Sequence, residues 1–99
     1  MRKYDVIKKV SKLTGIPKTD VLITLEAFFQ EVKNSVKDGE NVYVRGFGSF
    51  IAKKRKGRMA MNISKREKVF VPAHYQPVFL PAKVFMDMVK QIPIEEEKV

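Results

Sequence analysis

The sequence predicts a small α+β domain with two N-terminal helices, a three-stranded antiparallel sheet that carries a long β-arm, and a short C-terminal helix. Three observations predict it. The N-terminal part carries apolar residues at steps of three and four, the spacing of amphipathic helices. Short apolar segments bounded by glycine follow, which is typical of strands joined by turns. A strongly basic segment without apolar periodicity separates the last two strands, so we expect it to project as an arm.

Two helices are expected first. One spans about residues 4–14, with Asp5 in its first turn, where a carboxylate complements the helix dipole, and Gly15 as the residue that ends it. A longer helix spans about residues 18–37. Its apolar stripe is assigned to the core and consists of Val21, Leu25, Phe28, Phe29, Val32 and Val36.

The strands come next. Residues 41–44 form the first, and a second begins at Ser49 after a tight connection through glycine. A third resumes at residues 69–71, breaks at Pro72 and continues at residues 78–79, where Pro77 indicates an edge strand or a bulge.

The last helix is expected to hold Pro81 in its first turn and to run through Val89. Residues 93–99 are expected to form a flexible acidic tail, and residues 1–92 the folded domain, with the arm at about residues 53–70. A body this small is marginal alone, so its wide apolar helix stripes favour burial against a second copy.

The charge is concentrated in one segment. The chain has a formal net charge of +9, and residues 52–68 hold eight basic residues and one acidic residue, which accounts for +7 of it. Charge of this kind indicates a polyanionic partner: nucleic acid, an anionic membrane surface or an acidic protein. Met59, Met61 and Ile63 are interleaved with these cations. Proteins that grip the minor groove push such apolar side chains between base steps, so each is a candidate wedge.

No catalytic or metal-binding pattern is present in the sequence. The chain has no cysteine and one histidine, His74, for which a structural or turn role is favoured. The serines lack the context of a nucleophile. We expect a non-enzymatic binding protein without cofactor, metal or small-molecule substrate. The first residues lack a secretory apolar run and no stretch is long enough to span a membrane, so a cytoplasmic protein is expected.

A resemblance to a known family rests on three motifs. Residues 46–50 read Gly-Phe-Gly-Ser-Phe, a proline stands at position 72, and residues 79–83 read Phe-Leu-Pro-Ala-Lys. Together with their spacing, these motifs make the chain similar to the HU/integration host factor family of bacterial histone-like DNA-binding proteins over about residues 1–90. The resemblance implies an intertwined dimer that wraps two β-arms along the minor groove and bends or compacts DNA, largely without sequence specificity. It also implies association with the nucleoid.

The resemblance also implies roles for individual residues. The family carries arginine, asparagine and proline at the arm tip, where this chain reads Met61, Asn62 and Ile63. Ile63 thus takes the place of the intercalating proline. Leu80 and Pro17 are further departures from the family pattern. The residues expected to contact DNA are Lys3, Arg45, Lys53, Arg55, Lys56, Arg58, Asn62, Lys65, Arg66, Lys68 and Lys83.

Alternatives to this interpretation remain open at the level of the sequence. Phosphate contacts do not by themselves separate DNA from RNA, so the same arm is compatible with RNA binding. A third interpretation is a structural or packaging protein whose arm binds an acidic protein partner. Within the main interpretation, double-stranded DNA and a second copy of the chain are the expected partners, and a heterodimer with a paralogue is the other possible assembly.

Overall fold

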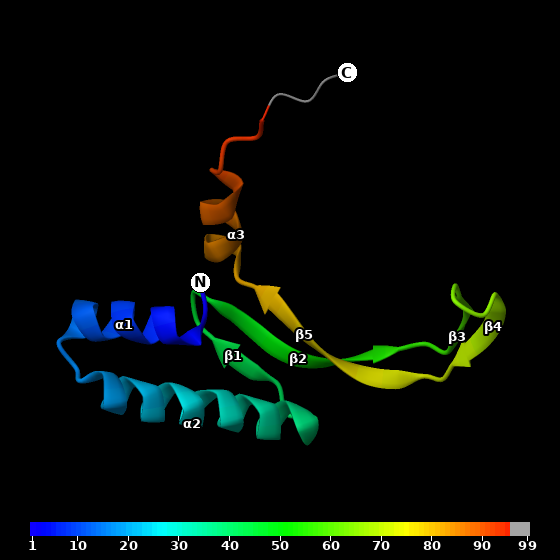
Figure 1. Ribbon diagram of the computed structural model, residues 1–99, viewed down its shortest axis with the longest axis horizontal. Coiled ribbons are helices and arrows are strands. Elements are labelled where there is room, and N and C mark those ends of the chain that lie inside the picture. Colours follow the sequence, from blue (N-terminus) through cyan, green and yellow to red (C-terminus); the bar gives the residue numbers. More distant parts are fainter. Residues whose placement is uncertain (96–99) are drawn as a thin grey trace. The chain divides into compact units, whose positions relative to one another are not determined.

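Residues 1–95 are the part of the chain that the computed structural model describes (Figure 1). It divides into two units, Met1–Asn34 and the remainder. Residues 96–99, which end the expected acidic tail, lie outside the described part. The elements in chain order are α1 (Lys3–Thr14), α2 (Lys18–Lys37), β1 (Val42–Val44), β2 (Gly48–Arg55), β3 (Arg58–Asn62), β4 (Glu67–Val71), β5 (His74–Pro81) and α3 (Lys83–Lys90).

The two N-terminal helices begin and end close to where the sequence predicts. Asp5 Oδ2 accepts the backbone N–H of Arg2 at 2.9 Å, which satisfies a free donor at the start of α1. Gly15 adopts a left-handed conformation and donates its N–H to the carbonyl of Ser11 at 2.8 Å, which closes the other end. Within the described residues, no helix is long and apolar enough to cross a membrane.

The predicted apolar stripe of α2 is only partly covered within one chain. Val21 is buried, while Phe28 and Phe29 remain exposed and contact each other edge to face, with ring centroids 5.9 Å apart. Among residues 1–95, Val21 and Ile7 of α1 are the only buried apolar residues. The single chain therefore buries one residue of the predicted stripe fully and leaves the other five partly or largely accessible.

The main sheet is antiparallel and has the strand order β1–β2–β5. β2 is central, and the register pairs Phe50 with Phe79 and, further along, Arg55 with His74. β5 lies at an edge, where the missing N–H of Pro77 leaves no ladder partner unsatisfied. The expectation that Pro77 marks an edge strand is confirmed.

The basic segment contains more strand structure than its sequence indicates. β3 and β4 form a separate antiparallel pair, which runs from the pair Arg58–Val71 to the pair Asn62–Glu67. We call residues 58–71 the tip hairpin. In Figure 1 this hairpin lies at the end of the β2–β5 ribbon that is distant from α3. Short breaks at residues 56–57 and 72–73 separate it from the main sheet.

One sequence expectation is wrong at the last helix. Pro81 is the final residue of β5, where it pairs with Gly48, and α3 begins at Lys83. The extended chain continues through Ala82, whose N–H donates to the carbonyl of Phe47 at 2.9 Å. This bond holds the segment against the sheet one residue beyond the proline, so the helix starts later than the proline alone suggests.

Aromatic rings anchor α3 to the sheet. Phe47 stacks on Phe85 of α3 with centroids 5.5 Å apart, and it lies 5.1 Å from Phe79. Phe50 completes the cluster at 5.0 Å from Phe79. Such offset and tilted pairs stabilise a small core beyond the area they bury. The β2–β5 ribbon extends from this cluster toward the tip hairpin.

Candidate nucleic-acid interface

Cations follow one face of the β2–β5 ribbon. Successive residues of a strand point to opposite faces, so Lys53 and Arg55 share a face, and their cross-strand partners Gln76 and His74 share it with them. All four side chains are exposed. The strand register therefore turns part of a charge run into a row of donors along one side of the ribbon.

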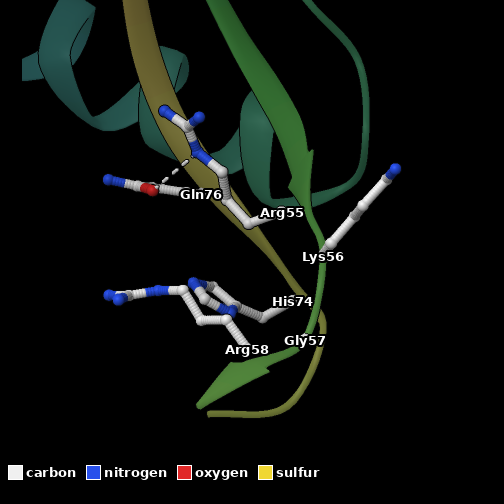
Figure 2. Close-up of a pocket in the computed structure, with 6 residues that line it drawn as sticks. All are labelled: Arg55, Lys56, Gly57, Arg58, His74 and Gln76. Carbon is white, nitrogen blue, oxygen red and sulfur yellow. Dashed lines mark hydrogen bonds between the residues drawn. The ribbon is translucent and has the colours of Figure 1, made fainter. Parts of the chain in front are cut away.

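This row ends in an open hollow of about 480 Å³ (Figure 2), which is lined by Arg55, Lys56, Gly57, Arg58, His74 and Gln76. Arg55 Nε donates to Gln76 Oε1 at 3.1 Å, which ties the guanidinium to the neighbouring strand. His74 is held by its own turn, with Nδ1 3.0 Å from the carbonyl oxygen of Pro72. Figure 2 shows Arg55 and Arg58 extending to one side of the strands and Lys56 to the other.

The chemistry of the hollow favours an anion. Three of its six lining residues are basic, and none is acidic. Arginine presents paired N–H groups that match phosphate oxygens, and lysine adds a point charge. No group of three or more metal-ligating residues occurs among residues 1–95. The arrangement suits a phosphate group.

The tip of the hairpin is shaped by Asn62. Its Oδ1 accepts the backbone N–H of Ser64 at 3.1 Å and, more weakly, that of Lys65 at 3.4 Å. Arg66 completes the turn with a φ of 53°, in the left-handed region. Ile63 lies between these residues and is 87% exposed. An apolar side chain is thus presented at the outermost turn by a polar residue that organises the loop.

The other predicted contact residues lie apart from this hollow. Lys65, Arg66 and Lys68 surround the tip turn, Arg45 lies in the connection between β1 and β2, and Lys83 begins α3. Lys3 belongs to the N-terminal unit, where its Nζ forms an ion pair with Glu26 Oε1 at 2.8 Å. Arg55, Lys56 and Arg58 line the hollow, Lys53 lies on the same face of β2 as Arg55, and the other predicted contact residues belong to different segments.

Besides Gly57, two residues of the hollow, His74 and Gln76, were not among the predicted contacts. Sequence reasoning gave His74 a turn role and did not consider Gln76. Both enter the site because β5 pairs with β2 in a register that sets them beside Arg55 and Lys53. The only signal that could have placed His74 and Gln76 in the site was the pairing of β5 with β2. The interruption of the strand at Pro72 obscured that signal.

Comparisons with known proteins agree on one family. Residues 1–90 match the family described as "Bacterial DNA-binding protein". DNA-binding protein HU of Thermus thermophilus is 35% identical over 89 residues, which cover 90% of this chain and 92% of that protein. DNA-binding protein HU 2 of Bacillus phage SPbeta is 34% identical and covers 91% of this chain and 98% of its own length. The Anabaena HU–DNA cocrystal structure is similar with a TM-score of 0.86 at 30% identity, covering 94% of this chain and all of the matched one.

Proposed function

Because the chain belongs to the bacterial DNA-binding protein family that includes HU, as its motifs indicate, we propose that it is a non-enzymatic architectural protein that binds double-stranded DNA in the minor groove as a dimer and bends or compacts it. The observation that carries this proposal is a hollow lined by Arg55, Lys56 and Arg58 and by no acidic residue, at the root of a basic hairpin with an apolar tip. We expect such a protein to act at the nucleoid.

Phosphate contacts supply the affinity in this proposal. Each cation that neutralises a phosphate releases condensed counterions, which favours binding without reading sequence. The hollow receives one backbone phosphate, and the cations around the tip meet phosphates further along the groove. The proposed contacts outside the hollow are Lys3, Arg45, Lys53, Asn62, Lys65, Arg66, Lys68 and Lys83.

Bending is assigned to Ile63. A side chain that is almost fully exposed contributes little to folding, and a branched apolar group at the outermost turn has the shape of a wedge between base steps. Unstacking a step costs a few kcal/mol, which the additional contacts along a bent duplex offset. The turn that Asn62 organises would hold the wedge in position.

The apolar surface that a single chain leaves exposed supports a dimer. Only Ile7 and Val21 are buried apolar residues within residues 1–95, which is too little to stabilise an isolated fold. Exposed Phe28 and Phe29 continue the stripe of α2. A second apolar surface is a groove of about 380 Å³ lined by Phe79, Pro81, Phe85, Met86, Val89 and Lys90. We infer that a second copy covers both surfaces and that the dimer carries two arms.

A competition experiment tests the proposal. Binding is measured on labelled plain, nicked and pre-bent DNA duplexes, with duplex RNA and a polyacidic peptide as competitors. We expect tighter binding to the nicked and pre-bent duplexes than to the plain one, and weak competition by the peptide. Equal or stronger competition by duplex RNA would identify RNA as the ligand, and strong competition by the peptide would identify an acidic protein. Size-exclusion chromatography with light scattering reports the oligomeric state.

A further inference from the structure

The tip hairpin has one face that is unusually apolar for an exposed basic element. Residues that pair across β3 and β4 share a face, so Met59 and Phe70 lie on the same side, and Met61 and Lys68 continue it. We call Met59, Met61 and Phe70 the Met–Phe face. Their side chains are 59%, 58% and 61% exposed. On the opposite face, Ala60 and Val71 are partly covered.

The phenyl ring of Phe70 is supported from behind. A Cβ added at Gly57 would lie 3.0 Å from Phe70 Cζ, so the absence of a side chain at Gly57 leaves room for the ring against the strand. The rest of the ring remains open to solvent. A flat aromatic surface is thus held at the edge of the phosphate-binding hollow, to which Gly57 also belongs.

The charge around the Met–Phe face restricts its partner. Arg58, Lys65, Arg66 and Lys68 belong to the same hairpin, with Glu67 as its one acidic residue. A second arm would bring the same positive charge against it, so like-charge repulsion disfavours arm-to-arm packing. The partner has to combine negative charge with flat apolar surface. Nucleic acid offers both, but duplex bases are stacked on one another and expose only their edges.

We propose that the Met–Phe face stacks on unpaired bases, so that the arm has a second binding mode, for single-stranded or locally melted DNA. The phosphates of such a strand would meet the neighbouring cations while a base lies on the Phe70 ring, with the two methionines beside it. Stacking of bases on aromatic side chains is tolerant of sequence, as suits a protein without base-specific contacts. This inference rests on the arm being a nucleic-acid interface, and it adds a ligand class to it.

The test uses a fluorophore that the natural chain lacks. The protein contains no tryptophan, so Phe70→Trp introduces a single indole on the Met–Phe face, and Val69→Trp places one on the opposite face as a matched control. With oligo(dT) of 20 nucleotides, emission of the Phe70→Trp protein should be quenched by stacking, while that of Val69→Trp should change little.

Anisotropy titrations of Phe70→Ala should show about a 5- to 150-fold loss of oligo(dT) affinity. Its affinity for a plain duplex of the same length should change less than about twofold.

Each other result overturns the inference in a recognisable way. Equal quenching in both tryptophan proteins, or unchanged oligo(dT) affinity in Phe70→Ala, would show that single strands are held by charge alone. Equal quenching of Phe70→Trp by anionic phospholipid vesicles would identify a membrane surface, and quenching that rises with protein concentration alone would identify self-association. If neither duplex nor oligo(dT) binds the unmodified chain, the proposed function itself fails. Circular dichroism confirms that each variant is folded, and Phe70→Leu repeats the affinity test with a smaller change in volume.

Discussion

The ring of Phe79 occupies the space that a side chain on Gly48 would need. A Cβ added at Gly48 would lie 2.6 Å from Phe79 Cζ and 2.5 Å from the carbonyl oxygen of Leu80, so both a side chain and the backbone of β5 would be displaced. Gly48 is buried and starts the central strand. The close approach of these two strands sets the position of the aromatic cluster and, through it, the base of the ribbon.

Gly48→Ala should therefore destabilise the fold. Overpacking of this kind costs about 1–3 kcal/mol, and a backbone contact leaves little freedom to relax. Chemical denaturation should show a lower midpoint. Gly46→Ala is the control: its left-handed conformation costs about 1–2 kcal/mol, but no neighbour lies within 4 Å. A smaller loss for Gly48→Ala than for Gly46→Ala would contradict the steric argument.

Phe29→Ala tests the dimer. If the second copy buries this ring fully, its removal should cost about 3–5 kcal/mol, measured as unfolding free energy of the assembly. Because folding and association are then linked, the thermal midpoint of the unmodified protein should rise with its concentration. Sedimentation should show the variant dissociating at concentrations where the unmodified protein remains dimeric. A stable, well-folded monomer of the unmodified protein at micromolar concentration would contradict the prediction.

The cations that line the hollow should determine part of the salt dependence of DNA affinity. If Arg58 meets one phosphate in each arm, Arg58→Gln in a dimer should remove two contacts and lower the slope of log K against log salt by about 1.8, at about 0.9 for each contact. Lys12→Gln, an exposed cation of α1 outside the predicted set, removes the same charge and should leave the slope nearly unchanged. Equal slopes for all three proteins would show that Arg58 contacts no phosphate.

Ile63→Ala should uncouple bending from stability. The side chain is almost fully exposed, so the thermal midpoint should change little, whereas fluorescence transfer across a short duplex should report a smaller bend. Plain duplex affinity should fall less than the preference for nicked sites, because the phosphate contacts remain. Ile94→Ala, at a similarly exposed isoleucine after α3, is the matched control. Equal bending by the Ile63 variant and the unmodified protein would remove Ile63 from the mechanism.

The ion pair between Lys3 and Glu26 allows a role of Lys3 in stability to be distinguished from a role in DNA binding. Both side chains are about half exposed, so the pair should contribute about 0–1 kcal/mol to stability. Glu26→Gln should therefore leave the unfolding free energy within about 1 kcal/mol. It should also strengthen duplex binding, because the Lys3 ammonium no longer has a competing carboxylate. Unchanged affinity in low salt would argue that Lys3 does not contact DNA.

The sequence by itself determined the features that depend on near neighbours. Both N-terminal helices follow from apolar residues at steps of three and four, and their ends follow from Asp5 and Gly15, whose hydrogen bonds reach only three or four residues. The net charge follows from the composition, and its concentration in one segment follows from the order of the residues. The family motifs at residues 46–50 and 79–83 carried the resemblance, which the comparisons confirm.

Only the tertiary structure decided which distant residues meet. β3 was not predicted because its sequence, Arg-Met-Ala-Met-Asn, does not alternate between apolar and polar residues, and its pairing with β4 depends on residues across the turn. His74 joins Arg55, and Phe70 rests against Gly57, through the register of strands far apart in the sequence. Pro81 remains extended because Ala82 bonds to Phe47. A strand finds its hydrogen-bond partners at long range, whereas a helix finds them four residues away, so local pattern defines helices and leaves the β-built site to tertiary contacts.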